Sequence, residues 1–261
     1  MYLEFAGLPG SGKSTLSSAL KKHLLSLACP VLSREEAILK CIRRRDDGRI
    51  KNMLKRFPYR IWRPLMGTEF SVPEFVSLSS RHLEFISFIS KMLSESNLPE
   101  LLIESIWSTI IKSFSELQLV SQHIYDSEMV IMDEAFSHRC FTLFGYMENL
   151  VSDDLISQYA KLAPILNQVF WIVTDPRTCV ERFMRRYQSR PVPYGFKLDK
   201  GELLNNFTTG NRVLESLSDA LKDQGKYVHR INGDRYISES IEEINSVASR
   251  IWLKKVHESR H

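Results

Sequence analysis

The sequence is poor in the features that mark exported, metal-stapled or membrane-spanning proteins. It has four cysteines, far apart and without a CxxC pair, which speaks against a zinc site and a disulfide framework: Cys29, Cys41, Cys140 and Cys179. We expect reduced thiols in a core. No run approaches the roughly 20 apolar residues of a membrane span, and no basic segment followed by an apolar one opens the chain. These absences predict a cytoplasmic protein without a membrane partner.

The composition is that of an ordinary globular protein. Apolar residues make up 43% of the 261 residues and charged residues 25%, which is too apolar for a disordered chain. A chain of this length can bury one good core and still carry a sizeable insertion. We therefore expect a single domain over residues 1–261.

Positive charge is concentrated in one segment. The net charge of the chain is +4, yet residues 40–63 hold ten Lys or Arg against Asp46 and Asp47, a local net charge of +8 that leaves the rest at −4. Such a segment can attract an anionic substrate, a nucleic acid or a lipid surface. The solvated face of a helix explains it equally well, and the sequence does not choose between these interpretations.

Short apolar runs alternate with longer helical patterns. Five runs predict strands, at residues 2–6, 30–34, 129–133, 169–174 and 227–231. Four of the five lack polar alternation, as expected of parallel strands covered by helices on both faces, and the intervening stretches supply the crossovers. The pattern predicts an α/β fold of three layers, in which helices flank a five-stranded parallel sheet.

About a hundred residues between the second and third runs contain no convincing strand. Helical periodicity predicts helices over roughly residues 33–53, 72–95 and 98–122. Proline and glycine at Pro58, Pro64, Gly67 and Pro73 predict a mobile connection within this region rather than a domain boundary. We expect a helical insertion at about residues 40–126.

The strongest motif follows the first strand. Residues 7–14 match G-x-x-x-x-G-K-[ST] and lie between a strand and the helical stretch 15–27. In such a loop, glycines let backbone N–H groups surround phosphates, and the helix N-terminus adds its positive dipole. Lys13 is then placed for the β- and γ-phosphates and Ser14 for Mg²⁺. The residues expected to bind ATP or GTP are Gly7, Pro9, Gly10, Ser11, Gly12, Lys13, Ser14 and Thr15.

A second anchor for the metal ion ends the third strand. Four apolar residues at 129–132 precede Asp133 and Glu134, a pattern typical of a Walker B strand. Asp133 is expected to hold Mg²⁺ directly or through water, while Glu134 is placed to orient a water or contact an acceptor. An apolar run that ends in two acids is common by itself. It indicates a Walker B strand here only because the phosphate-binding loop is also present.

With these motifs the sequence resembles the nucleoside and nucleotide monophosphate kinases, particularly the thymidylate kinase and deoxynucleoside kinase branches. The likeness covers the core and not the insertion. Ser33-Arg34-Glu35-Glu36 is similar to the T-R-E-P segment of thymidylate kinases, although the proline is missing. The resemblance implies that Glu35 or Glu36 is the base toward an acceptor hydroxyl and that Arg34 is an acceptor ligand. The other interpretation is the first turn of a solvated helix, where Glu is favourable.

A helix after the fourth strand is rich in arginine. Asp175-Pro176 begins it, and Pro191 must end it. Its arginines are Arg182, Arg185, Arg186 and Arg190, of which the first three share a face. This resembles the E-R-x-x-x-R lid of the kinases, over about residues 176–201. The resemblance implies that Arg182 and Arg186 neutralise charge on the transferring phosphoryl group and that Arg182 also binds the nucleotide. An ordinary basic helix face is the alternative.

The sequence also departs from the family pattern. An Asp-Arg pair after the third strand is not matched, which puts thymidylate in doubt as acceptor. Arg139 comes later, and either reaches an acceptor phosphate or pairs with a surface acid. We expect His138 on the surface, because phosphoryl transfer needs no histidine. Residues 232–234 and the helix at 238–252 resemble the base-facing loop and closing helix of these kinases.

The leading hypothesis is an ATP-dependent phosphotransferase that uses Mg²⁺ and a small anionic or hydroxyl-bearing acceptor. A nucleoside or nucleotide is the acceptor that the resemblance implies, and a sugar or glycan would use the same parts. The alternative is a P-loop NTPase switch, or a nucleic-acid-associated ATPase using the basic 40–63 segment. The missing N-K-x-D motif and the arginine lid favour a kinase. A sulfotransferase is disfavoured because the full G-K-S and the Walker B pattern indicate a nucleoside triphosphate.

Overall fold

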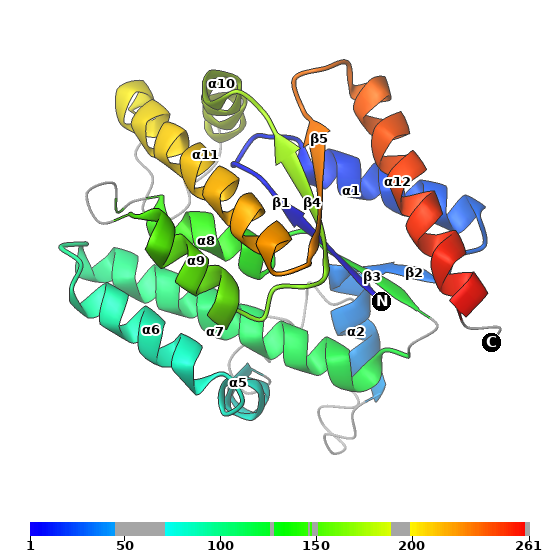
Figure 1. The fold of residues 1–261 in the computed structure, drawn as a ribbon, viewed down its shortest axis with the longest axis horizontal. Helices are drawn as coiled ribbons and strands as arrows, with labels where there is room; N and C mark the ends of the chain where they lie inside the picture. Colours follow the sequence, from blue (N-terminus) through cyan, green and yellow to red (C-terminus); the bar gives the residue numbers. More distant parts are fainter. Residues whose placement is uncertain (45–70, 126–127, 146, 148–150, 189–198, 259–261) are drawn as a thin grey trace.

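The sheet carries the fold. A computed structural model describes residues 1–44, 71–125, 128–145, 147, 151–188 and 199–258. Within them, one all-parallel sheet has the order β2-β3-β1-β4-β5 (Figure 1). Its strands are β1 (Tyr2–Ala6), β2 (Val31–Ser33), β3 (Met129–Met132), β4 (Gln168–Val173) and β5 (Tyr227–Asn232). The five predicted strands are confirmed, and so is the three-layer α/β architecture.

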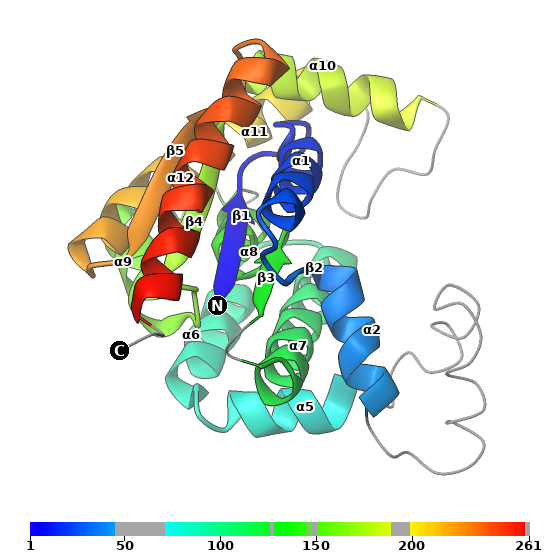
Figure 2. The same cartoon turned by 90° about the vertical axis from the view of Figure 1, so that its right-hand side faces the viewer.

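Two helices cover one face of the sheet. These are α1 (Lys13–Ser26) and α12 (Ile237–Glu258), the blue and red helices that lie together in Figure 2. Leu16, Leu20 and Leu24 recur at helical spacing and meet Phe5 and Phe170 from the strands. This layer fixes the start of α1, and with it the end of the loop that joins β1 to α1.

The opposite face is covered by α7 (Glu100–His123), α8 (Phe136–Phe144) and α11 (Lys200–Asp223). Outside them lie α6 (Leu83–Ser94) and α9 (Asp153–Leu162). Phe114 of α7 meets Phe136 of α8 edge to face, with ring centroids 4.9 Å apart, and Phe85 of α6 lies 5.8 Å from Phe136. The insertion therefore shares the main core rather than forming one of its own.

One of the helices predicted for the insertion is interrupted in the structure. The predicted helix over residues 72–95 is two helices, α5 (Ser71–Ser79) and α6. Between them a turn forms, in which the backbone N–H of His82 donates to Ser79 O at 2.9 Å, and Arg81 bonds Gln118 of α7. The break lets α5 pack along α7 while α6 continues elsewhere in the core, a tertiary requirement that periodicity does not encode. Helix α2 (Arg34–Arg44) follows β2, and the rest of its predicted extent to residue 53 lies outside the described residues.

A buried carboxylate ties β1 to α8. Glu4, in the middle of β1, is 0% exposed and accepts hydrogen bonds from the Ser137 hydroxyl at 2.5 Å and from the Ser137 backbone N–H. Burial raises the pKa of Glu4, partly offset by these bonds. The contact fixes the first turn of α8, which carries His138 and Arg139. None of the described helices is long and apolar enough to cross a lipid bilayer.

Candidate active site

The loop between β1 and α1 has the backbone that its glycines predict. Gly10 and Gly12 have φ of 85° and 99°, values that favour glycine. A Cβ at Gly10 would lie 2.5 Å from the Cys179 carbonyl oxygen of α10 (Pro176–Tyr187), so the loop packs closely on that helix. Helix α1 begins after Gly12 without a side-chain cap. Its first N–H groups therefore keep the geometry that suits an anion.

Lys13 is folded onto this loop. Its side chain is buried, and its Nζ donates to Gly7 O at 2.8 Å and to Leu8 O at 2.9 Å. An ammonium has three N–H donors, so one remains for a phosphate oxygen. Burial lowers the pKa of Lys13 to about 8, although the carboxylates of Glu134 and Asp133 favour its charged form.

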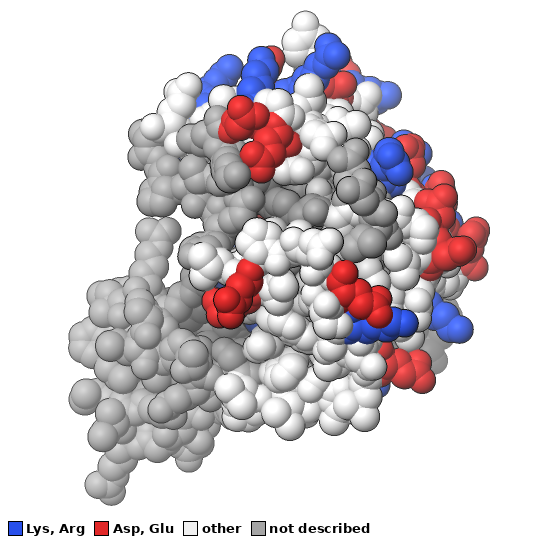
Figure 3. All heavy atoms as spheres, turned by 90° about the vertical axis from the view of Figure 1, so that its left-hand side faces the viewer, with Lys and Arg blue, Asp and Glu red and all other residues white. Residues whose placement is uncertain are grey.

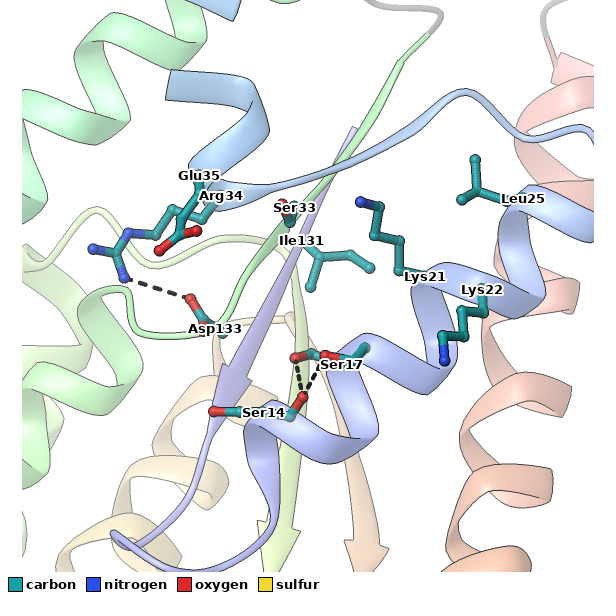
Figure 4. A pocket seen from close by; sticks show the side chains of 11 residues that line it. Ser14, Ser17, Lys21, Lys22, Leu25, Ser33, Arg34, Glu35, Ile131 and Asp133 are labelled. Carbon is teal, nitrogen blue, oxygen red and sulfur yellow. Dashed lines mark hydrogen bonds and ion pairs between the residues drawn. The ribbon is translucent and has the colours of Figure 1, made fainter. Parts of the chain in front are cut away.

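Two cavities lie on either side of Ser14, and we name each after a glutamate in its wall. The Glu35 cavity has a volume of about 500 Å³ and lies between α1, the end of β2 and the end of β3 (Figure 4). The Glu134 cavity has a volume of about 250 Å³ and lies between the phosphate-binding loop, α7, α8 and α10. Ser14 is common to both.

The predicted metal ligands share the Glu35 cavity. Ser14 and Asp133 both line it, and Figure 4 shows their side chains near the mouth of the phosphate-binding loop. Among the described residues, no group of three or more His, Cys, Asp or Glu could hold a metal ion. One carboxylate and one hydroxyl nevertheless fit Mg²⁺, which takes one or two protein ligands and completes its shell with phosphates and water.

Arg34 connects the insertion to this cavity. Its Nε lies 2.9 Å from Glu116 Oε2 of α7, its Nη2 donates to Glu116 Oε1 at 3.1 Å, and its Nη1 donates to Asp133 at 3.5 Å. Burial opposes its charge, but the carboxylates of Glu116, Asp133 and Glu134 together outweigh that effect, and the pKa of Arg34 is raised. Arg34 is thus a fixed cation beside Asp133, and an acceptor would have to compete with Glu116 for it.

The two predicted bases behave differently. Glu35 lines the Glu35 cavity. Glu36 accepts from the Ser33 backbone N–H at 2.9 Å and forms an ion pair with Lys21 of α1, so it holds the first turn of α2. Glu36 lines neither cavity. The geometry gives Glu36 a structural task and leaves Glu35 as the one of the pair that lines a cavity.

The walls of the Glu134 cavity combine charge, hydroxyl groups and rings. The P-loop contributes Lys13 and Ser14, and α10 contributes Arg186. Further lining residues from α7, α8 and α10 include Leu102, Ser105, Ile106, Thr109, Phe141, Thr142, Phe183 and Tyr187. Leu102, Ser105, Ile106 and Thr109 come from α7. Helix α7 belongs to the predicted insertion, so the insertion forms part of the cavity wall.

His138 is buried, contrary to the expectation of a surface histidine. It is 6% exposed, and its Nδ1 lies 3.1 Å from Gly7 O. A carbonyl oxygen can only accept, so Nδ1 carries the proton. Burial, helped by the charge of Lys13, lowers the pKa of His138 to about 3, and the ring is neutral at physiological pH. His138 supports the loop beside Lys13, a role that depends on α8 packing against β1.

Arg139 and Glu134 are neighbours in the same cavity. Arg139 is 5% exposed, and its Nε donates to Ser113 Oγ at 2.9 Å while its Nη2 lies 3.8 Å from Glu134 Oε2. Burial lowers the pKa of Arg139. Burial alone would raise the pKa of Glu134, but surrounding cations, Arg139 and Lys13 among them, lower it well below its ordinary value. Glu134 is therefore ionised, 47% exposed and directed to the cavity. The role expected of Glu134 from the sequence, to orient a water or contact an acceptor, stays a prediction.

Helix α10 brings two of its arginines to the loop. Arg182 Nη1 donates to Gly10 O at 3.4 Å, and Arg186 lines the Glu134 cavity. Arg185 is exposed, and Arg190 lies outside the described residues. Figure 3 shows basic side chains gathered along the end of the molecule that α10 occupies in Figure 1. Asp175 caps α10, accepting from the Arg177 backbone N–H at 2.8 Å, as predicted.

The segment 232–234 lies beside the same loop. Thr174 donates to Ser11 O at 3.1 Å, the Gly233 backbone N–H donates to Val173 O at 2.7 Å, and the Asp175 backbone N–H donates to Asp234 Oδ2 at 2.8 Å. That this segment faces a nucleotide base stays a prediction.

Most of the basic 40–63 segment lies outside the described residues. Of its described members, Lys40 forms an ion pair with Glu128, and Arg44 lies over the Tyr125 ring at 4.7 Å. These two side chains face protein groups, so they give no support to a nucleic-acid surface.

No family model matches the chain, and no curated protein matches it in sequence. Among solved structures, a thymidylate kinase from Ehrlichia chaffeensis is similar over 97% of this chain and 98% of its own, with a TM-score of 0.44 and 16% identity. A deoxyadenosine kinase from M. mycoides with bound dCTP is similar over 95% of this chain and 100% of its own, with a TM-score of 0.43 and 15% identity. At this degree of likeness, function has to be argued from this chain's own residues.

Proposed function

We propose that this chain transfers the γ-phosphoryl group of ATP to a small acceptor held in the Glu134 cavity. The observation that carries the proposal is that one cavity brings together Lys13 of the loop after β1, Arg186 of α10 and an ionised carboxylate, Glu134. A cation pair for the migrating group and an acceptor for a hydroxyl proton are what such a transfer needs.

The donor side is formed by residues 7–15. Backbone N–H groups at the start of α1 and the free donor of Lys13 would hold the phosphates. Mg²⁺ would be held by Ser14 and Asp133 and would neutralise charge on the β- and γ-phosphates. Arg182, which contacts Gly10 O, would stand over the same phosphates.

The acceptor side is formed by α7, α8 and α10. We infer that a nucleoside or nucleotide enters between their apolar and hydroxyl side chains, although a sugar of similar size has the same chemistry. The acceptor hydroxyl oxygen bonds to the γ-phosphorus as the bond from that phosphorus to the β–γ bridging oxygen breaks, and ADP leaves. Glu134 orients the hydroxyl and takes its proton late in the step, when the proton has become acidic. This moves the base from Glu35 or Glu36, the sequence-based candidates, to Glu134.

The experiment for the proposal is a transfer assay. Purified protein is incubated with Mg²⁺, γ-labelled ATP and a panel of nucleosides, nucleotides, sugars and sugar phosphates, and label in the acceptor is measured against label released as phosphate. Transfer to a member of the panel supports the proposal. Release of phosphate with every acceptor, unchanged by their addition, would support the NTPase switch instead.

Nucleotide affinity should fall as the pH rises through about 8. Burial lowers the pKa of Lys13 to about 8, so the free protein loses the ammonium above that pH, while bound phosphates favour it. The dissociation constant of ATP should therefore rise by up to about tenfold per pH unit above pH 8. Equilibrium dialysis from pH 7.5 to 9.5 measures this. The Lys13→Arg variant is the control, because its guanidinium stays charged and its affinity should be flat with pH. Equal slopes in the two proteins would contradict the assignment to Lys13.

Replacing the two lid arginines should slow transfer more than it weakens ATP binding. Arg182→Gln with Arg186→Gln keeps helix propensity nearly unchanged and removes two charges near the loop and the cavity. We expect transfer to fall by about a hundredfold or more, roughly 2.7 kcal/mol, with a much smaller change in ATP affinity.

The matched control for the lid lies on the same helix. Arg177 and Arg185 are exposed and line neither cavity, so the double change to Gln removes the same charge from elsewhere on α10. Its transfer rate should stay within about threefold of wild type. Equal losses in the two double variants would show a general charge effect, and an equal loss of ATP affinity and rate would make Arg182 and Arg186 ground-state ligands.

A further inference from the structure

A third cavity lies at the opposite end of the sheet. It has a volume of about 900 Å³ and is bounded by the first residues of β1, β4 and β5 and by the C-terminal half of α12. In Figures 1 and 2 the N-terminus of the chain lies beside that end of α12. Ligands of open parallel sheets usually bind at the carboxyl ends of the strands, so this cavity is not explained by the site described above.

Its walls carry basic side chains and, among the described lining residues, no acidic one. Arg250 and Lys254 come from successive turns of α12, and the next residue, Lys255, donates from its Nζ to Glu128 O at 3.5 Å. Arg250 lies close enough to His229 of β5 for its charge to add to burial in lowering the pKa of His229. A concave wall with charges of one sign focuses the field on a ligand of the opposite sign.

The rest of the wall is apolar or offers neutral hydrogen-bond groups. Ile165 and Ile251 contribute apolar surface. His229 Nε2 donates to Gln168 Oε1 at 2.9 Å, which leaves the amide NH₂ of Gln168 as a further donor group. A cavity of this volume falls within the range of small-molecule sites, about 300–1,000 Å³. The apolar surface suits the ring of an aromatic ligand, and the neighbouring cations suit an anionic group attached to that ring.

The cavity is separate from the phosphate-binding loop. Tyr2 lines it at the start of β1, and Gly7 follows the end of the same strand, about 16 Å away at the rise of a parallel strand. No lining residue is shared with the Glu35 or Glu134 cavities.

We propose that this cavity is a second ligand site, which takes a small anionic molecule with an aromatic ring. The proposal stands on the basic side chains of α12, the amide donor group of Gln168 in β4 and the apolar walls beside them. It does not depend on the phosphotransferase activity.

The test uses 1-anilinonaphthalene-8-sulfonate, a fluorescent ring-bearing anion. Its dissociation constant is measured for the wild type and for the full-length double variant Arg250→Gln with Lys254→Gln. Removing two cationic contacts should weaken binding by about tenfold or more. Pyrophosphate, which has charge but no ring, should displace the dye from the wild type.

Two controls separate this site from other binding. Arg212→Gln with Lys222→Gln removes the same charge from α11, where both side chains are exposed and outside the cavity. Lys13→Ala removes the P-loop ammonium. Both should bind the dye within about twofold of wild type. Each single variant, Arg250→Gln and Lys254→Gln, is also titrated, and its affinity for the dye should fall by about threefold. The single variants keep the test valid if the double variant folds poorly.

The proposal is overturned if the α12 and α11 double variants lose affinity equally, because net charge alone would then explain binding. It is also overturned if none of the α12 variants loses affinity, if Lys13→Ala abolishes dye binding, or if pyrophosphate fails to compete.

Discussion

Replacing Lys13 by alanine should reduce phosphoryl transfer to below about 1% of the wild-type rate, a loss of at least 2.7 kcal/mol of transition-state stabilisation. The ammonium of Lys13 is the cation that the loop itself supplies, and two of its N–H groups hold the carbonyl oxygens of Gly7 and Leu8. Alanine removes both the charge and the bonds that shape the cradle. Initial rates of label transfer at saturating ATP and acceptor measure the loss.

A second variant keeps the result interpretable. Lys13 is buried, so alanine leaves a small cavity, whereas Lys13→Met keeps most of the volume and removes only the charge and the donors. Both variants should melt within a few degrees of wild type, because loss of a buried charge offsets loss of two hydrogen bonds. Retention of more than about a tenth of the activity in the methionine variant would contradict the role given to Lys13.

The sequence predicts the parts of this fold that are local. The apolar runs of β1, β3 and β4 are buried on both faces, so continuous hydrophobicity marks them without knowledge of their neighbours. The loop of residues 7–14 follows from glycine conformation and the strand–helix context. The sequence analysis sets no bounds for helix α11, and a glycine such as Gly210 in the middle of a helix is unfavourable. That glycine is needed because a Cβ there would lie 2.3 Å from the Phe141 ring.

The candidate site is harder to predict from the sequence, because the residues that line it are far apart along the chain and come together only in the fold. Thr109 and Glu134 line one cavity although helix α7 and the strand β3 separate them along the chain. His138 looks like a surface residue until α8 packs against the loop, and Glu4, an acid within an apolar run, holds α8 in place. The resemblance to kinases points to Glu35 or Glu36, while the cavity that contains Lys13 and Arg186 points to Glu134. Choosing between these carboxylates is the sharpest question that the structure raises.

Glu134→Gln should lower phosphoryl transfer to a hydroxyl acceptor by a factor of about 10²–10⁴, while Glu35→Gln should stay within about threefold of wild type. Each change replaces one carboxylate by an amide of the same shape. Glu134 lies with Lys13 and Arg186 in one cavity, whereas Glu35 lines the other cavity with Asp133. Arg139 keeps its bonds to Ser113 and to the Glu134 carbonyl in the variant, so the cavity wall should hold.

The outcomes of this pair separate three arrangements of the site. The rates are measured with saturating Mg²⁺ and ATP, and ATP affinity is measured beside them, because loss of a base lowers the rate without a matching loss of nucleotide binding. A large loss in Glu35→Gln with a near-normal Glu134→Gln would place the acceptor in the Glu35 cavity and restore the sequence-based prediction. Near-normal rates in both would mean that no carboxylate takes a proton, as expected if the accepting oxygen belongs to an ionised phosphate. A large loss in Glu134→Gln alone assigns the acceptor to the cavity that α7 and α8 form over the phosphate-binding loop.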